Sequence, residues 1–161
     1  MSPSPVTLDV LGPTVQVLTP IDGDPGAPCA LRGALPPGTV VPMHAHPDPE
    51  TFVMLSGELD GWQEQAGWGR ARPGDAVHVP GGVRHAWRNP GAEPAVSIVV
   101  TTARMGAFFA EIGTPLAPGE RSAWPPSPAA VERLLGAAAR LGHWNASPAE
   151  NAAIGIVLPG A

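Results

Sequence analysis

Two stretches of this sequence decide the fold, and the first reads Gly38-Thr39-Val40-Val41-Pro42-Met43-His44-Ala45-His46-Pro47-Asp48-Pro49-Glu50. The second stretch reads Pro80-Gly81-Gly82-Val83-Arg84-His85-Ala86-Trp87-Arg88-Asn89. Together they contain three histidines and one glutamate at spacings that suit a single metal ion. The rest of the chain is expected to form the structure that surrounds these four side chains.

The first two histidines belong to one predicted strand. Alternate residues of a strand point to the same face, so His44 and His46 are expected to project together. Glu50 follows a proline-rich turn and starts the next strand, and His85 starts a later one. If sheet pairing brings these strands together, three imidazoles and a carboxylate converge. Such ligands suit one divalent transition metal (Fe, Mn, Ni, Co, Cu or Zn) and do not select among them.

The residues around these side chains, 14–101, have the pattern of an all-β structure. About nine short β-rich runs recur at spacings of roughly 8–12 residues. The 22 prolines and 20 glycines of the chain punctuate these runs and form no low-complexity tract. The pattern predicts a sandwich or a barrel core over 14–101, not alternating strands and helices.

Residues 102–161 have a different pattern and are predicted to form a C-terminal helical extension and tail. One helix is expected between Thr102, as its N-cap, and Gly113. A second helix is expected from Ser127-Pro128 to Gly142, with the apolar stripe Val131, Leu134, Leu135, Ala138 and Leu141. Ser147 begins a capping-box pattern, and 154–158 is either a last strand or a docked extension. At 161 residues the chain is expected to be one domain, 1–161.

The composition argues against several classes of function. The net charge is −5, and the nine basic residues, all arginine, form no cluster, so nucleic-acid binding is not expected. No apolar run approaches about 18 residues, and the N-terminus lacks the pattern of a secretory signal. A single cysteine, Cys29, excludes an internal disulfide and is expected to be a small core residue. A cytoplasmic protein without membrane contact is the simplest expectation.

The two stretches resemble the paired motifs of the cupin superfamily. The first motif, G-x5-H-x-H-x3-E-x6-G, is matched by Gly38, His44, His46, Glu50 and Gly57. The second motif, G-x5-P-x-G-x2-H-x3-N, is matched by Gly74, Pro80, Gly82, His85 and Asn89. The resemblance implies a double-stranded β-helix (a jelly-roll barrel), a metal held by the three histidines and Glu50, and a homodimer. Residues 108–115 also resemble the C-terminal extension of quercetinase-like bacterial monocupins.

Several side chains near the expected metal have two interpretations. Glu50 either stays a metal ligand or leaves the metal and acts as a catalytic base. Phe52 and Met54 share its strand face, and Trp87 shares the equivalent face of a later strand. These three residues line either the plain core or an apolar substrate pocket. His143, which follows the second predicted helix, is expected to lie in solvent.

The most direct functional hypothesis is a metal-dependent dioxygenase, as quercetinase-like cupins are. Four protein ligands on a six-coordinate ion leave two adjacent positions open. A chelating, apolar or aromatic hydroxy-ketone is the small-molecule substrate that suits them. Without dioxygen, the same site would serve a metal-dependent isomerase, cyclase or lyase on a small metabolite. A non-catalytic cupin that binds a metal or a small molecule is the other alternative, because fold alone does not decide function.

Overall fold

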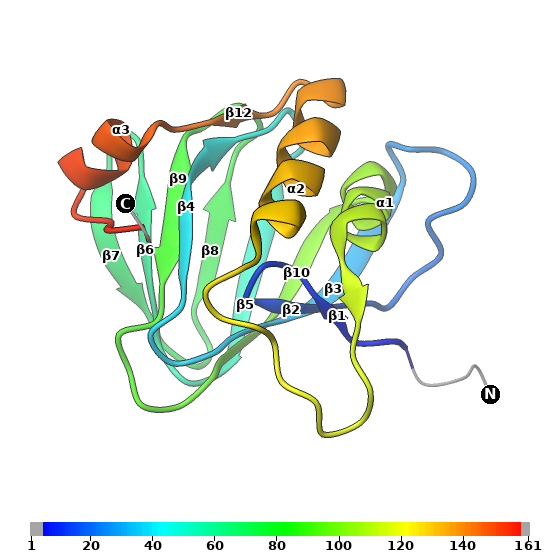
Figure 1. The fold of residues 1–161 in the computed structure, drawn as a ribbon, viewed down its shortest axis with the longest axis horizontal. Helices are drawn as coiled ribbons and strands as arrows, with labels where there is room; N and C mark the ends of the chain where they lie inside the picture. The colour runs from blue at the N-terminus through cyan, green and yellow to red at the C-terminus, as the bar shows by residue number, and fades with distance from the viewer. Residues whose placement is uncertain (1–4, 159–161) are drawn as a thin grey trace.

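The computed structural model describes residues 5–158 and consists mainly of two antiparallel sheets, with a few short helices (Figure 1). Sheet A has the strand order β11-β1-β2-β3-β10-β5-β8, and sheet B has the order β12-β4-β9-β6-β7. The all-β fold class predicted from the sequence is confirmed.

The strands are β1 (Leu8–Asp9), β2 (Thr14–Val17), β3 (Pro28–Leu35), β4 (Val40–Ala45), β5 (Glu50–Ser56), β6 (Leu59–Gln63), β7 (Gly67–Ala71), β8 (Ala76–Val79), β9 (His85–Arg88), β10 (Ala95–Thr102), β11 (Thr114–Pro115) and β12 (Trp144–Asn145). The helices are α1 (Ala103–Ile112), α2 (Pro128–Arg140) and α3 (Pro148–Ala153).

The central strands have the connectivity of a jelly roll. The eight strands β3 to β10 can be counted in chain order from first to eighth. In sheet A they lie side by side in the order β3, β10, β5, β8, which is first, eighth, third, sixth. Those of sheet B run second, seventh, fourth, fifth. Successive strands therefore alternate between the sheets, except for the β6–β7 hairpin, and this is the order of two nested Greek keys. The jelly-roll expectation is confirmed, and β1, β2, β11 and β12 extend the sheets at their edges.

The inner face of sheet A carries two core clusters, and a third, with Met43, Ala86 and Ile156, lies between sheet B and the C-terminal tail. Alternation in β10 buries Ala95, Ser97, Val99 and Thr101 and leaves the residues between them more exposed. One half of the face packs against sheet B in a cluster that includes Met54, Leu59, Ala71 and Trp87. The other half packs against α1 and α2 in a cluster that includes Leu31, Val99, Phe108 and Ala138. The helices thus cover the part of sheet A that sheet B leaves open.

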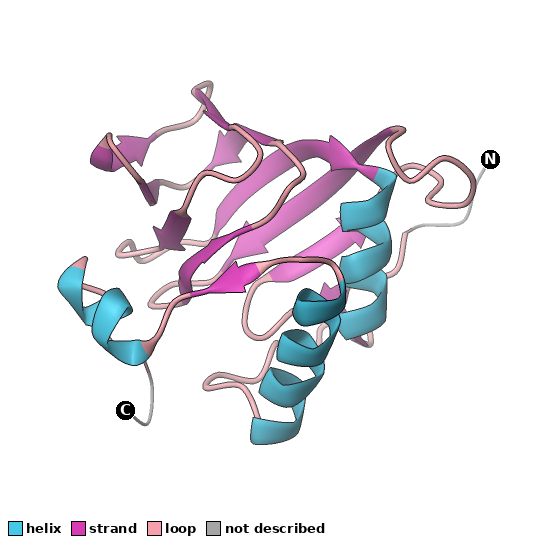
Figure 2. Cartoon of the chain, turned by 90° about the horizontal axis from the view of Figure 1, so that it is seen from above, coloured by secondary structure: helices cyan, strands magenta, loops and turns pink. Residues whose placement is uncertain are grey.

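The helix ends follow the capping chemistry predicted from the sequence. Thr102 caps α1 by accepting from the Met105 amide, and Ser127 caps α2, which has proline in its first turn. Ser147 and Glu150 form a capping box at the start of α3. Helices α1 and α2 lie side by side, whereas α3 lies apart from them and contacts β4 (Figure 2).

One expectation about the extension needs correction, and another, which had left two alternatives open, is decided. The apolar stripe predicted on α2 is wrong in part, because the buried residues are Ala137 and Ala138, while Leu135 is 46% exposed. Alanines face α1 here because their small side chains let the two helices approach closely. Residues 154–158 form no strand; the tail is docked instead, and Ile156 is only 2% exposed.

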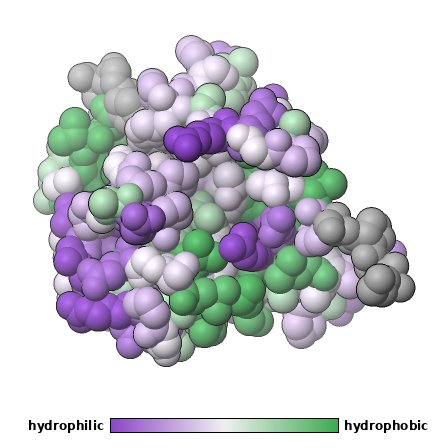
Figure 3. All heavy atoms as spheres, turned by 90° about the horizontal axis from the view of Figure 1, so that it is seen from below, coloured by the Kyte–Doolittle hydropathy of each residue, from purple (hydrophilic) through white to green (hydrophobic). Residues whose placement is uncertain are grey.

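The surface mixes polar and apolar side chains, as the face seen from below shows (Figure 3). On the outer face of sheet A, Val53, Leu55 and Val100 are 36%, 50% and 45% exposed. Within residues 5–158, none of the helices combines the length and the hydropathy that crossing a bilayer requires.

Candidate metal centre

Pairing of β4 with β9 brings the predicted histidines together. His44 lies directly opposite His85 in this antiparallel pair, and their ring centroids are 4.2 Å apart. His46 follows two residues later, with its ring 5.5 Å from that of His44 and 5.1 Å from that of His85. One ring nitrogen of each histidine lies within 4.8 Å of the other two, so these three side chains can hold one metal ion.

Each of the three imidazoles is oriented by a backbone carbonyl. The Nδ1 atoms of His44, His46 and His85 lie 2.8, 2.7 and 2.9 Å from the carbonyl oxygens of residues 42, 48 and 83. A carbonyl oxygen only accepts hydrogen bonds, so each neutral ring carries its proton on Nδ1 and has a free lone pair on Nε2. This is the tautomer that Nε2 coordination of a metal requires.

Two of these Nε2 atoms are buried without any hydrogen-bond partner. They belong to His46 and His85, which are 3% and 1% exposed. A buried polar atom left unpaired is costly, by about 1–3 kcal/mol, and a native structure normally satisfies it. A metal ion coordinated by these nitrogens would remove that cost, so the donor set fits a metal.

The fourth predicted ligand, Glu50, is adjacent to the three-histidine group but is not part of it. Its Oε2 atom lies 3.5 Å from Nε2 of His46 and 3.6 Å from Nε2 of His85. The carboxyl is 5% exposed and starts strand β5, as the sequence predicted. The geometry therefore keeps both roles open, a ligand reached by a small movement or a base beside the metal.

The pKa values of Glu50, His46 and His44 are shifted by burial and by their neighbours in the cluster. Burial raises the pKa of Glu50, but the His46 and His85 imidazoles outweigh burial and hold that pKa well below its usual range. Burial lowers the pKa of His46, but the Glu50 carboxylate overrides it, so the pKa of His46 is raised. The pKa of His44 falls to about 3 because its ring is buried and lies beside the other two histidines. Glu50 is thus ionised and His44 neutral at neutral pH.

A second acid, Asp48, fixes the loop between His46 and Glu50. Its carboxylate is buried and accepts from Thr102 Oγ1 at 2.6 Å. It also accepts from Nε and Nη2 of Arg104 at 3.0 and 2.7 Å. Because the Asp48 carbonyl orients His46, this ion pair ties the start of α1 to a candidate metal ligand. Sequence reasoning gave Asp48 and Arg104 no role, since their contact joins residues 56 positions apart.

The glycine-rich turn before His85 packs directly on the same loop. The Gly82 amide donates to the His46 carbonyl at 2.8 Å. A Cβ atom on Gly81 would collide with the carbonyl oxygen of Pro47. Gly81, at the variable position between Pro80 and Gly82 of the second motif, therefore has to be small so that this turn can approach the loop of the first motif.

His143 also reaches the site, although the sequence predicted that it lies in solvent; that prediction is wrong. Its ring packs on Phe108 at 4.7 Å and on His46 at 5.4 Å, and its Nε2 is buried without a partner. Burial lowers the pKa of this ring. His143 immediately precedes β12, and no spacing in the sequence shows that β12 pairs with the strand that carries His44.

The predicted pocket residues lie in the closed part of the barrel next to the histidines. Phe52 and Trp87 pack at 4.4 Å between ring centroids, and Trp87 is 6.3 Å from the His85 ring. Met54 and Trp87 are 2% and 4% exposed, within the core cluster between the sheets. A cavity of about 320 Å³ lies elsewhere, between α1 and Ile21 and Pro25. Phe52, Met54 and Trp87 therefore do not line this cavity.

The family model for the cupin domain matches residues 31–101. This range includes both sequence motifs and every histidine of the three-histidine group. Together with the jelly-roll order of the strands, the match identifies residues 31–101 as a cupin domain. No curated protein sequence matches it significantly.

Several solved structures resemble this one over part of their length. The polyketide cyclase RemF from Streptomyces resistomycificus has a TM-score of 0.56 at 16% identity, over 64% of this chain and 78% of that one. A cupin-superfamily sugar phosphate isomerase from Silicibacter pomeroyi DSS-3 has a TM-score of 0.50 at 26% identity, over 58% and 61%. The DMSP lyase DddQ from Ruegeria pomeroyi DSS-3 has a TM-score of 0.49 at 29% identity, over 55% and 45%. This chain thus spans less than two thirds of the isomerase and of the lyase.

Proposed function

We propose that this protein is a metal-dependent enzyme that acts on a small substrate able to chelate the metal. The observation that carries the proposal is the convergence of three oriented imidazoles, two of which bury an unpartnered Nε2. His44, His46 and His85 would hold one divalent transition metal, and Glu50 would lie beside it as a base that can also serve as a fourth ligand. When bound, the ion would supply Lewis acidity to the substrate oxygen atoms.

The residues around the ion suit proton abstraction from a hydroxy-ketone. Glu50 is held ionised beside His46 and His85, so its carboxylate can accept a proton from a substrate hydroxyl. Phe52, Met54 and Trp87 would bind the apolar or aromatic part of the substrate.

We favour a quercetinase-like dioxygenase as the reaction, because the aromatic pair Phe52 and Trp87 stands next to the ligands and suits a flat substrate. Isomerisation of a small metabolite is the second candidate. It is favoured by the similarity to the sugar phosphate isomerase and by the position of Glu50 outside the three-histidine group, which suits a base.

Oxygen consumption distinguishes the two reactions. Protein loaded with metal is incubated aerobically with a flavonol such as quercetin, while flavonol absorbance and dissolved oxygen are followed together. The dioxygenase predicts loss of both signals with the native protein and of neither with His85→Ala. Turnover of an α-hydroxy-ketone at the same rate under argon would instead establish the isomerase. Full metal loading without turnover of either substrate would leave a binding protein and refute the enzyme.

We also propose a homodimer through the outer face of sheet A. Val53, Leu55 and Val100 expose apolar side chains there, and burying such side chains is the usual source of stability in a homodimer interface. Sedimentation should show a dimer that Leu55→Glu converts to monomers. A native protein that sediments as a monomer at all concentrations would contradict this assembly.

A further inference from the structure

Strand β4 contains a bulge immediately before the metal-binding histidines. Val41 lies opposite Trp87 in the ladder with β9, but the next pair is His44 with His85, so β4 has one extra residue. Pro42 and Met43 therefore fall outside the regular pairing. The Pro42 carbonyl of this bulge accepts from His44 Nδ1, so the shape of the bulge sets the direction of the His44 ring.

The C-terminal segment satisfies the backbone groups that the bulge leaves unpaired. The Met43 amide donates to Oδ1 of Asn151 at 2.8 Å, across 108 residues of sequence. The Met43 carbonyl accepts from the Ala146 amide at 3.0 Å. Directly before Ala146, β12 pairs with β4 so that Asn145 lies opposite His44.

Asn151 is completely buried, and its whole amide group is used. In addition to accepting from Met43, its Nδ2 donates to the carbonyls of Ala146 at 3.3 Å and Ser147 at 3.1 Å. It is 0% exposed. A leucine of similar size would fill the same volume but leave the Met43 amide without this partner, so polarity at this position serves a specific contact.

We propose that Asn151 is a positioning residue for the metal ligand His44. Asn151 binds the Met43 amide and so fixes the shape of the β4 bulge. The bulge in turn places the Pro42 carbonyl beside His44 Nδ1. That contact orients the His44 ring so that its Nε2 faces the other two histidines. The C-terminal extension is thereby part of the metal centre, although it supplies no ligand. The proposal rests on metal binding by the three histidines, as proposed above.

Cobalt(II) is the probe for the test, because its visible absorption reports ligand geometry and its titration gives affinity. Metal-free full-length protein is titrated as the native form, Asn151→Leu, His44→Ala and the double variant. Loss of an outer partner of a ligand typically lowers metal affinity by about 10–100-fold. We expect about a tenfold loss for Asn151→Leu, a changed absorption spectrum, and no further loss when the same substitution is added to His44→Ala.

Trp68→Phe is the matched control. It removes the hydrogen bond from Trp68 Nε1 to the Ile154 carbonyl, a contact of the same tail that involves neither the Met43 amide nor a histidine. It should lower the melting temperature and leave cobalt affinity unchanged. If Asn151→Leu does not fold, Asn151→Ser takes its place, since the shorter side chain cannot reach the Met43 amide.

The cobalt titrations test the positioning role of Asn151 and the proposed metal function separately. Unchanged affinity and spectrum in folded Asn151→Leu, or the same tenfold loss in the His44→Ala background, would overturn the positioning role alone. A native protein that binds no cobalt would instead overturn the proposed metal function on which the inference rests.

Discussion

Arg104, near the start of α1, grips the buried carboxylate of Asp48 with two of its nitrogens, at 3.0 and 2.7 Å. Asp48 is 2% exposed, so its charge needs this partner. The same residue presents its carbonyl to Nδ1 of His46. This ion pair therefore stabilises the fold and at the same time orients a candidate metal ligand.

Substitution of Arg104 should affect both properties. Arg104→Ala leaves the Asp48 carboxylate buried with Thr102 as its remaining polar side-chain partner, so we expect a loss of about 2 kcal/mol in unfolding free energy, reduced by the 43% exposure of Arg104. We also expect about tenfold weaker cobalt binding. Chemical denaturation and metal titration measure the two effects.

The control for this experiment is Arg140→Ala. Arg140 pairs with Glu111 on the surface, and both side chains are at least half exposed, so the change should cost less than about 1 kcal/mol and leave metal affinity intact. If Arg104→Ala weakens stability without weakening metal binding, Asp48 does not orient His46.

Gly81→Ala should loosen the metal centre by crowding. Its Cβ would collide with the Pro47 carbonyl, which belongs to backbone and cannot rotate away. We expect a loss of about 1–3 kcal/mol in stability and weaker metal binding, because the displaced loop carries His46. Gly69→Ala is the matched control, since nothing lies within 4 Å of a Cβ at that position. Equal melting temperatures for the two variants would refute the close-approach explanation.

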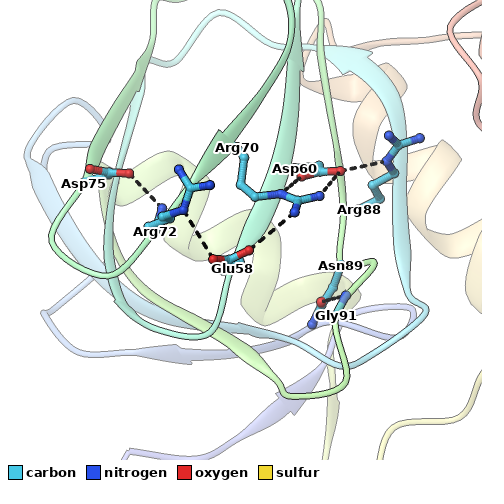
Figure 4. A network of polar contacts seen from close by, with 8 residues as sticks. All are labelled: Glu58, Asp60, Arg70, Arg72, Asp75, Arg88, Asn89 and Gly91. Atoms are coloured by element: carbon cyan, nitrogen blue, oxygen red, sulfur yellow. Dashed lines mark hydrogen bonds and ion pairs between the residues drawn. The ribbon is translucent and has the colours of Figure 1, made fainter.

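Acid should weaken the ion-pair network on sheet B. Figure 4 shows Asp60 between Arg70 and Arg88, with Arg70 donating from two nitrogens at 2.7 and 3.2 Å. These bonds, those of Arg70 first, lower the pKa of Asp60. Because the pKa of Asp60 is lower in the folded than in the unfolded protein, the ionised carboxylate stabilises the fold at pH values above the unfolded-state pKa of about 3.9. This contribution is lost as the pH falls through the folded-state pKa.

Asp60→Asn should therefore be less stable than the native protein by about 1–2 kcal/mol at neutral pH, with the difference shrinking below about pH 4. Denaturation curves from pH 7 to pH 2 measure this. Asp22→Asn, at an exposed position in a loop, is the control and should show no such trend. A difference that stays constant across this range would mean that the charge of Asp60 is unimportant.

Glu50→Gln tests whether this residue is needed for holding metal or for moving protons. Glu50 lies beside the three-histidine group, so the variant should retain most of its metal while turnover falls by about 10²–10⁴-fold. Metal analysis and the oxygen assay are run on the same preparation. Loss of metal together with activity would make Glu50 an essential ligand instead of a base.

The barrel and the histidine cluster were predictable because local patterns encode them. His44 and His46 share a strand face by alternation, and the turn before His85 is marked by two glycines. Thr102 and Ser127 indicate where two helices begin, because both residue types are common N-caps. In each case the deciding contact lies within a few residues, or follows from the order of the strands.

The supporting residues could not be predicted because their partners are distant in sequence. Asn151 looks like an ordinary helix residue until the β4 bulge exposes the Met43 amide to it. His143 looks like a solvated residue after a helix until β12 brings it against His46. The pattern on α2 was right in part: Ala138 is buried and Leu134 and Leu141 pack against the core, but Leu135 is exposed.

The central claim is that His44, His46 and His85 bind one metal ion. Elemental analysis of the full-length protein, as purified and after reconstitution with each candidate divalent metal, tests it most directly. We predict about one ion per chain in the native protein and a large loss in His85→Ala, because that variant removes a ligand at the centre of the cluster. A native protein that retains no metal under any of these conditions would contradict the account.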